Sequence, residues 1–492
     1  MFLVIRLSGM AIFLTQIFFS LSAQDQVYRT EIKLESGIGV NREILPIVSS
    51  DTFQLIFLDR NSVQVLELDQ HFYEISKYSM MRDYTNSNLL GYSLGEDGIH
   101  LFLADSKMRK FSIETLKPGG SKSTVQTFYF PHKKERFLQA FNYKNKFFLL
   151  SVKKFSSELS LYEFEGDYLI GEKTIDLSDH NFSSHSYPDL YSNVTGIEGY
   201  GTALKMAVVN TNEPISLELA SDPSKLYVRE GEIVITIDNE LSNTKIITID
   251  IDTYDHKYQM VNHESLNCGN ALNIVSNSFL QDNKLFQVKA CNSRLNLMVK
   301  DLETNETIKV FQLEEDDNSL MNSPAIQLGG TSLYTSPTDH EMNNFKAVLR
   351  KISKSDVGVA VNLLDQEYLL TIGGHLEVKN IASRLHAPVG GGTVSTPYGS
   401  VSLPSYNPTM VSFNGSKYSR TVYFKSILNQ LTLDHQSGEA PDSSFDIINE
   451  FEINLQNDLE INTLFRINHN YLYGVYDKKK QVFVLYQFPE ID

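Results

Sequence analysis

One pentapeptide of the chain has the spacing of a serine-hydrolase nucleophile. Gly91-Tyr92-Ser93-Leu94-Gly95 matches G-x-S-x-G, which in hydrolases exposes the serine oxygen on a turn between a strand and a helix. Here the turn formers Glu96-Asp97-Gly98 follow, and then the apolar residues Ile99–Phe102. Because this order predicts a second strand in place of the helix, the pentapeptide is interpreted as part of a strand–turn–strand unit. No catalytic residue is assigned.

Side chains that can bind a divalent cation gather in three places: Asp176, Asp179, His180, His185 and Asp189; Asp250, Asp252 and Asp255; and Glu314–Asp317. The first group has no recognised metal-ligand spacing, and the other two lack the glycine of a calcium loop. We interpret all three as solvated loops or turns. Gly390-Gly391-Gly392 is followed by neither a lysine nor a helical pattern, so it does not fit a phosphate-binding loop. From these patterns together, no metal and no cofactor is expected.

Basic residues cluster at Lys133, Lys134 and Arg136, at Lys153 and Lys154, and at Lys478–Lys480. They fall at predicted strand ends or turns, where lysine discourages pairing between sheet edges, and this reading is favoured over anion sites. The whole chain has 43 basic and 60 acidic residues, a net charge of −17. Because such a chain repels phosphate backbones, a nucleic-acid partner is not expected.

The first residues have the features of a secretory signal peptide. Arg6 is the only early charge, an apolar stretch runs from Met10 to Leu21, and small residues precede the polar Gln24. The stretch is shorter than the ~20 residues that a membrane span needs. We therefore expect a signal peptide over residues 1–23, cleaved after 22 or 23, with an uncleaved anchor as the alternative. The mature chain is expected to be secreted or periplasmic, without a transmembrane segment.

The only two cysteines, Cys268 and Cys291, flank a predicted hairpin of Ala271–Phe279 and Lys284–Cys291. The midpoint of the sequence between the two cysteines falls close to the turn of this hairpin. The two cysteines are therefore expected to lie near each other on adjacent strands. In an oxidising compartment this favours a disulfide, with two buried thiols as the alternative.

Short apolar runs separated by polar turns recur along the chain and predict β-hairpins. The predicted pairs are Phe53–Leu58 with Val63–Leu68, Ile99–Ala104 with Met108–Ile113, Phe147–Val152 with Leu159–Phe164, Ala203–Val209 with Ile215–Leu219, Ile233–Ile237 with Lys245–Ile249, Leu285–Cys291 with Arg294–Val299, Ala347–Ile352 with Val357–Leu363, Met410–Phe413 turning through Asn414-Gly415, and Tyr471–Tyr476 with Val482–Phe488. No helix of four turns is predicted: Tyr78–Leu90 and Ser444–Leu459 come nearest, and the second reads better as loop and strand.

These units are spaced by roughly 45 to 65 residues, a period typical of radially repeated sheets. In this respect the chain resembles β-propeller repeat proteins, at the level of architecture only. The expectation is an all-β fold, a β-propeller of seven or eight four-stranded blades over residues 24–492, with tandem β-sandwiches as the alternative. The segment Arg384–Asn407, rich in Gly, Ser, Thr and Pro, is expected to be a loop. To protect the sheet edges, the segment near Glu31–Leu34 is expected to pair with the last hairpin.

Two functions are compatible with these patterns. The favoured one is an exported, non-enzymatic binding or scaffold protein of the cell envelope or exterior, whose partner is a protein or a polysaccharide bound by loops at one end of the propeller. The alternative is a secreted glycan hydrolase or lyase that uses carboxylates at the mouth of the central channel. No residue pattern selects a pair of carboxylates for that chemistry.

Overall fold

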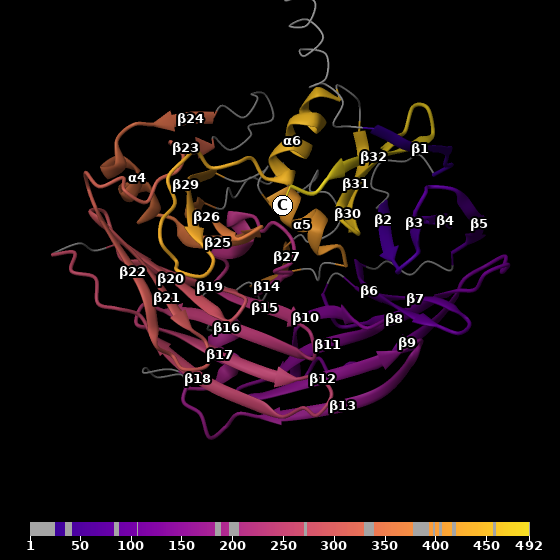
Figure 1. Ribbon diagram of the computed structural model, residues 1–492. Coiled ribbons are helices and arrows are strands. Elements are labelled where there is room, and N and C mark those ends of the chain that lie inside the picture. The colour runs from indigo at the N-terminus through magenta and orange to yellow at the C-terminus, as the bar shows by residue number, and fades with distance from the viewer. Residues whose placement is uncertain are drawn as a thin grey trace, which may run out of the picture. The chain divides into compact units, whose positions relative to one another are not determined.

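A computed structural model describes residues 25–34, 42–82, 88–105, 107–182, 188–195, 206–269, 273–328, 339–376, 393–396, 399–402, 406–415, 420–455 and 459–491. The chain divides into two compact units, described separately below. The first is built from Met1–Leu58, Gln64–Lys77 and Asp442–Ile491, and the second from Asp59–Val63, Tyr78–Pro441 and Asp492. Figure 1 labels their strands and helices.

The first unit holds two four-stranded antiparallel sheets. One is a meander of β2 (Glu43–Val48), β3 (Thr52–Leu58), β4 (Ser62–Asp69) and β5 (Glu74–Met81). The other consists of β30 (Leu459–Ile467), β31 (Asn470–Asp477), β32 (Val482–Pro489) and β1 (Asp25–Glu31). A helix, α6 (Ser444–Asn454), precedes β30. Alternating apolar side chains of these strands, among them Phe53, Leu55, Phe57, Leu472 and Leu485, form its core.

The first strand of the chain completes the sheet of the last hairpin. Strand β1 pairs antiparallel with β32, and Glu31 lies opposite Val482. The next residues are anchored as well, since Ile32 and Leu34 are buried. The Tyr476 hydroxyl donates to the Ile32 carbonyl at 3.1 Å and accepts from the Leu34 amide at 3.4 Å. The expected pairing of the two ends of the chain is confirmed, with the strand a few residues earlier than Glu31–Leu34.

The second unit holds five sheets of four or five strands. They are β6 (Asn88–Gly95), β7 (Gly98–Ala104), β8 (Phe111–Leu116) and β9 (Thr124–Phe128); β10 (Glu135–Tyr143), β11 (Lys146–Lys153), β12 (Glu158–Glu165) and β13 (Tyr168–Asp176); β14 (Met206–Val209), β15 (Ser224–Arg229), β16 (Glu232–Glu240), β17 (Asn243–Asp250) and β18 (His256–Asn262); β19 (Val275–Gln281), β20 (Lys284–Ala290), β21 (Arg294–Asp301) and β22 (Thr307–Glu314); and β24 (Asp339–Met342), β23 (Ala325–Leu328), β29 (Arg420–Asn429), β26 (Glu367–Leu376) and β25 (Asp356–Leu364).

A small two-stranded sheet, β27 (Thr393–Thr396) with β28 (Gly399–Ser402), lies between β26 and β29 in the chain. It falls in the segment expected as a loop over residues 384–407, and the other described residues of that segment are 406 and 407.

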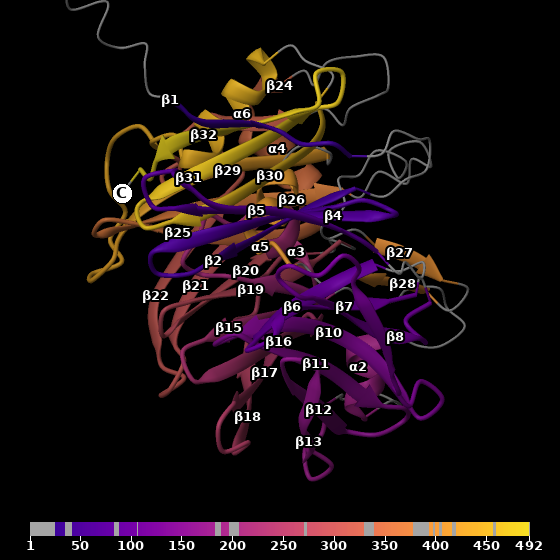
Figure 2. The ribbon, with the colours of Figure 1, turned by 90° about the vertical axis from the view of Figure 1, so that its right-hand side faces the viewer.

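Successive four-stranded meanders are the blades of a β-propeller, whereas a β-sandwich passes its chain between two facing sheets. Seven sheets of blade size occur in the described residues, and the expected all-β propeller of seven or eight blades is confirmed. Within the second unit, the sheets of β10–β13 and β14–β18 lie side by side in both views (Figures 1 and 2). A single propeller domain over residues 24–492 stays a prediction.

The same hydrogen-bonded turn follows one strand in each of three sheets of the second unit. The side-chain oxygen of the last residue of a strand accepts from backbone amides two and three positions later, at 2.7 to 3.0 Å, in Asp250, Asp301 and Asn429. A threonine occupies the third position after each, and its hydroxyl accepts from the amide two residues on, at 3.2 to 3.3 Å. The acidic group at Asp250 is therefore a structural turn, and its backbone donors lower the pKa of the Asp250 carboxyl.

Four segments expected as strands, hairpins or loops are helices instead. They are α3 (Leu217–Ser221), α4 (Phe345–Ile352), α5 (Pro408–Gly415) and α6. In α4 the buried residues Phe345, Val348, Leu349 and Ile352 recur at the helical period. Side chains cap three of the helices: Ser216 caps α3, Asn344 caps α4, and Ser443 forms a capping box with Asp446 at α6. The predictions of hairpins at 203–219, 347–363 and 410–415 are thus wrong where α3, α4 and α5 replace the expected strands.

Candidate functional site

The serine of the G-x-S-x-G pentapeptide is enclosed within a sheet. Ser93 lies in β6, is fully buried, and its Oγ accepts from the Gly166 amide at 2.8 Å. His100, opposite Ser93 on β7, uses Nδ1 to contact the Thr115 hydroxyl at 3.0 Å. The other ring nitrogen lies 3.0 Å from the Asp97 carboxylate. Because these contacts fill the surroundings of Ser93, the serine fixes the β12–β13 turn through Gly166 and is not an exposed nucleophile.

The histidine–aspartate group between residues 176 and 189 is used by local structure. Asp176 and Asp189 accept from the backbone amides of Ser178 and Ser192, at 2.9 and 2.8 Å. His180 stacks on Tyr258 with 4.6 Å between ring centroids. His185 and Gly390–Gly392 lie outside the described residues. Among the residues that the structure describes, no three His, Cys, Asp or Glu side chains are grouped as a metal site.

Two of the three basic clusters meet at one end of the second unit. The connection from β9 to β10 carries Lys133 and Lys134, and the turn from β11 to β12 carries Lys153 and Lys154. The Lys154 amide donates to the Lys134 carbonyl at 2.9 Å, which ties the two segments together. The fold therefore brings these two clusters together, and their interpretation as edge-protecting turns stays a prediction.

A third turn adds further positive charge beside them. Met108, in the turn from β7 to β8, is buried in the same hydrophobic cluster as Phe130 and Phe137. Since Phe130 and Phe137 flank the lysines of the β9–β10 connection, this packing brings Lys107, Arg109 and Lys110 to the same end of the strands. The three turns, with the strand residues Arg136 and Lys153 beside them, contain eight basic residues.

Two exposed aromatic rings stand among these basic residues. Tyr129 is 81% exposed and Phe155 is 70% exposed, although both residue types usually bury most of their area. Phe155 lies at the tip of its turn with a φ of 56°, and its ring is 5.2 Å from that of the buried Tyr191. We call this region the basic–aromatic surface, and it consists of Lys107, Arg109, Lys110, Tyr129, Lys133, Lys134, Arg136, Lys153, Lys154 and Phe155.

The surface is held by a rigid base. Beneath it Phe130 packs against Phe111 and Tyr162, with ring centroids 4.9 and 6.0 Å apart. Glu135 accepts from Ser151 Oγ at 2.5 Å and from the Tyr162 hydroxyl at 2.9 Å, so its carboxylate is used inside the fold. Rigid elements below exposed turns are the arrangement in which loops commonly bind partners.

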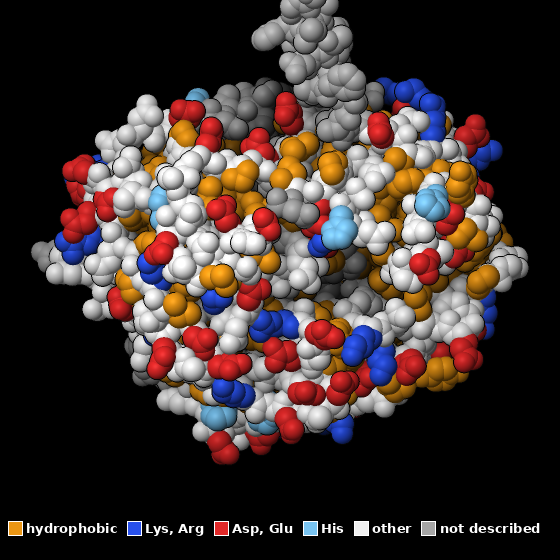
Figure 3. All heavy atoms as spheres, in the orientation of Figure 1, with side chains coloured by type: hydrophobic (Ala, Val, Ile, Leu, Met, Phe, Trp, Pro, Cys, Tyr) orange, Lys and Arg blue, Asp and Glu red, His pale blue; other side chains and the backbone are white. Residues whose placement is uncertain are grey.

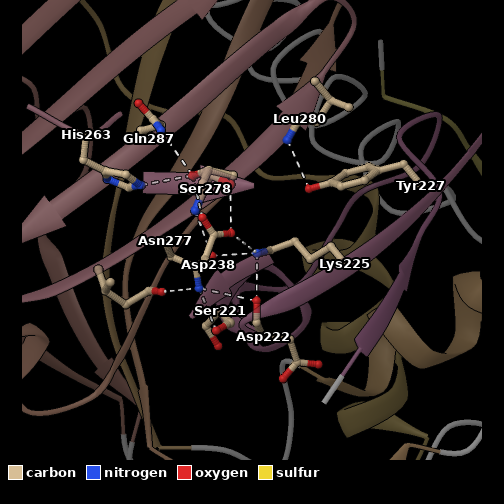
Figure 4. Close-up of polar contacts among 12 residues, drawn as sticks. Ser221, Asp222, Lys225, Tyr227, Asp238, His263, Asn277, Ser278, Leu280 and Gln287 are labelled. Carbon is tan, nitrogen blue, oxygen red and sulfur yellow. Dashed lines mark hydrogen bonds and ion pairs between the residues drawn. The ribbon is translucent and has the colours of Figure 1, made fainter. Parts of the chain in front are cut away.

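A second candidate is a chain of buried polar side chains between the sheets of β14–β18 and β19–β22 (Figure 4). The side chains of Lys225 and Asp238 are fully buried, and Lys225 Nζ lies 3.3 Å from Asp238 Oδ2. The same ammonium donates to Asn277 Oδ1 at 2.6 Å and to the Asp222 carbonyl at 2.7 Å. Burial lowers the pKa of Lys225, and the Asp238 carboxylate opposes that shift. All three ammonium protons therefore have acceptors within the fold.

The carboxylate of Asp238 is equally well satisfied. Besides the lysine, it accepts from the Ser278 hydroxyl at 2.8 Å and from the Thr244 hydroxyl at 2.7 Å. The Thr244 hydroxyl has a single proton, which it donates to Asp238. His263 Nε2 lies 3.0 Å from the Thr244 hydroxyl oxygen and must therefore be the donor of that hydrogen bond. Burial lowers the pKa of His263 to about 4. The imidazole is thus neutral near pH 7 and protonated on Nε2.

Asn277 extends the same network to a third sheet. Its Nδ2 donates to the Ser221 carbonyl at 2.8 Å and to the Val357 carbonyl of β25 at 2.9 Å. The network therefore spans the sheets of Lys225, Asn277 and Val357. Since none of its charged groups is open to solvent, we assign it a structural role in fixing neighbouring sheets of the second unit, and not a catalytic one.

The two cysteines form a disulfide close to this network. Cys268 and Cys291 are linked with 6.4 Å between their Cα atoms. Cys291 is buried directly after β20, and Cys268 lies in the connection from β18 to β19 that also carries His263. The disulfide therefore ties this connection to β20. The expected disulfide is present, and both cysteines lie just beyond the ends of the paired strands rather than on adjacent strands.

Replacing Cys291 by serine is expected to lower the free energy of unfolding by about 3 kcal/mol, because the unfolded chain loses a closed loop. Denaturant titration of the oxidised protein and the variant measures the difference. Added reductant should shift the transition of the natural protein toward that of the variant and leave the variant unchanged. Alkylation of both thiols in the denatured, unreduced protein would contradict the disulfide.

Three solved propeller structures illustrate what the chain resembles. The propeller of Dos1 has 9% sequence identity and a TM-score of 0.32, covering 92% of this chain and 84% of that one. The WD40 domain of SCAP from fission yeast has 10% identity and a TM-score of 0.31, with coverage of 94% and 98%. The β-propeller domain of Nup133 from Vanderwaltozyma polyspora has 13% identity and a TM-score of 0.26, with coverage of 59% and 78%.

No protein-family model and no curated protein matches the sequence. In the part of the chain that the structure describes, no helix is both long and apolar enough to cross a membrane.

Proposed function

We propose that this chain is an exported, non-enzymatic binding or scaffold protein of the cell envelope or exterior. It engages a protein or a polysaccharide through turns at one end of its propeller sheets. The observation that carries the proposal is the basic–aromatic surface, where Tyr129 and Phe155 expose 81% and 70% of their area and Lys107, Lys133 and Lys134 are exposed. Exposed aromatic rings on turns above a rigid sheet are well suited to contact a partner.

Export is supported by two independent features. Residues 1–23 have the sequence pattern of a signal peptide, although they lie outside the described residues. The chain also contains a disulfide between its only two cysteines, and such bonds persist in oxidising compartments. Both features favour a secreted or periplasmic location for a mature chain that begins at Ala23 or Gln24.

The proposal predicts that the natural chain, expressed in its source cells, is recovered outside the cytoplasm without its first 22 or 23 residues. Mass spectrometry of the N-terminus measures this. The recovered protein should bind a glycan or protein on an array of envelope components, and the ligand should be released chemically unchanged. An intact Met1 would contradict export, and cleavage of a bound glycan would replace the binding function by the hydrolase or lyase alternative.

A further inference from the structure

We infer that the basic–aromatic surface binds an acidic polysaccharide, a glycan whose sugar rings carry anionic groups. This inference rests on the proposed function and deepens it, because it selects one class among the possible partners. It follows from the local charge, from the exposed rings, and from the way the fold brings three turns together.

The local charge is opposite to that of the whole chain. The turns 105–110, 129–136 and 153–157 contain eight basic residues and two acidic ones, in a chain with 43 basic and 60 acidic residues. Acidic side chains are spread over the face shown in Figure 3. Because salt screens charges beyond about 8 Å in physiological solution, a bound polyanion responds mainly to the charges of the surface that it touches. The basic turns can therefore attract an anion despite the net charge.

Much of this positive charge is not used inside the fold. Among the described residues, Lys107, Lys133 and Lys134 have no ion-pair partner and are exposed. Lys153 is already paired, because its Nζ lies 2.7 Å from Glu158 Oε1, and Arg109 also has an interaction partner. The two acids of the turns are occupied as well, since Asp105 accepts from the Arg109 and Lys110 amides at 2.7 and 3.0 Å. Lysines left without partners can take anionic groups at little cost.

The rings favour a glycan over an acidic peptide. Tyr129 and Phe155 stand on turns and expose most of their area, although the Phe155 ring also lies 5.2 Å from that of Tyr191. A flat, exposed ring suits the apolar C–H face of a sugar, while neighbouring ammonium groups suit carboxylate or sulfate substituents. An acidic peptide such as polyglutamate offers carboxylates to the lysines but no apolar ring face to the exposed aromatic rings. Single-stranded nucleic acid also stacks on aromatic rings. At the proposed location outside the cytoplasm, however, the polyanions that the protein meets are acidic glycans.

The test measures binding of the mature protein to polygalacturonate, with dextran as the neutral glycan, polyglutamate as the acidic peptide, and single-stranded DNA. Polygalacturonate should bind most tightly, and added salt should weaken it. The double variant Lys133→Glu/Lys134→Glu should weaken binding on the order of tenfold or more. Lys257→Glu/Lys351→Glu changes two exposed lysines elsewhere in the second unit and should have little effect.

The rings are tested in the same way. Phe155→Ala and Tyr129→Ala should each weaken polygalacturonate binding severalfold, whereas Tyr168→Ala, which removes a ring 72% exposed at the other end of the strands, should not. Equal binding of polyglutamate or DNA, or indifference to the ring variants, would overturn the inference. If the Lys133→Glu/Lys134→Glu variant still binds another array component, the proposed binding function would stand and the inference of an acidic polysaccharide would not. Failure of every glycan and protein to bind would refute both.

Discussion

Replacing Asp238 by alanine is expected to destabilise the second unit by about 3–5 kcal/mol. The substitution leaves the fully buried Lys225 ammonium with two neutral acceptors, Asn277 and the Asp222 carbonyl. It also removes the acceptor of the Ser278 and Thr244 hydroxyls. Denaturant unfolding followed by circular dichroism measures the loss, and hydrogen exchange should localise it to β15, β16 and β19.

Two further variants separate the buried charge from other effects of this substitution. Asp238→Ala combined with Lys225→Met removes both charges and should recover much of the lost stability, since apolar replacement of a buried ion pair is often nearly neutral. Asp252→Ala, at an exposed turn of the same sheet, should change stability by no more than about 0.5 kcal/mol. A loss below about 1 kcal/mol for Asp238→Ala would show that the network does not hold the sheets together.

Deleting residues 25–34 is expected to unfold the sheet of β30–β32 at a markedly lower temperature. The deletion removes β1, exposes the edge of β32, and takes away Ile32 and Leu34, which are 0% and 6% exposed. Truncation of one buried aliphatic side chain costs about 2–5 kcal/mol, so the loss of both with a strand should exceed that range. Thermal unfolding and size-exclusion chromatography measure stability and association through the open edge.

Point variants keep this prediction testable if the deleted chain does not fold. Ile32→Ala should cost about 2–5 kcal/mol, and Tyr476→Phe, which removes the hydroxyl bridging Ile32 and Leu34, about 1–3 kcal/mol. Arg29→Ala, at an exposed position of β1, should change stability little. An unchanged unfolding transition after the deletion would mean that β1 adds nothing to the sheet.

The hairpins could be predicted because their signal is local. In Thr52–Leu58, the first four residues alternate between partly exposed and buried, the last three continue a buried apolar run, and a polar turn follows. Helix α4 was missed because Ala347–Ile352, which holds its apolar residues Val348, Leu349 and Ile352, was interpreted as one half of a hairpin. Its capping residue Asn344 was the available signal.

The candidate sites depend on contacts between distant residues, which a local pattern does not contain. The lysines of the basic–aromatic surface were visible in the sequence, but their meeting depends on the bond from Lys154 to Lys134 and on the packing of Met108. Lys225 gave no such signal, because it follows Asp222-Pro223-Ser224 and only precedes the apolar run Leu226–Val228. The turn of Asp250, Asp301 and Asn429 shares an Asp/Asn-x-x-Thr spacing that a search for repeats could have found.

The pairing of β1 with β32 also constrains how the chain reaches its native state. Glu31 and Val482 are neighbours in the sheet although nearly the whole chain separates them. A ribosome presents β1 long before its partner β32 exists. Closing so long a loop is slow, and until then the edge of β1 stays open to other strands. Refolding should therefore show a late kinetic phase in which protection of β1 and β32 appears together, after the second unit has formed.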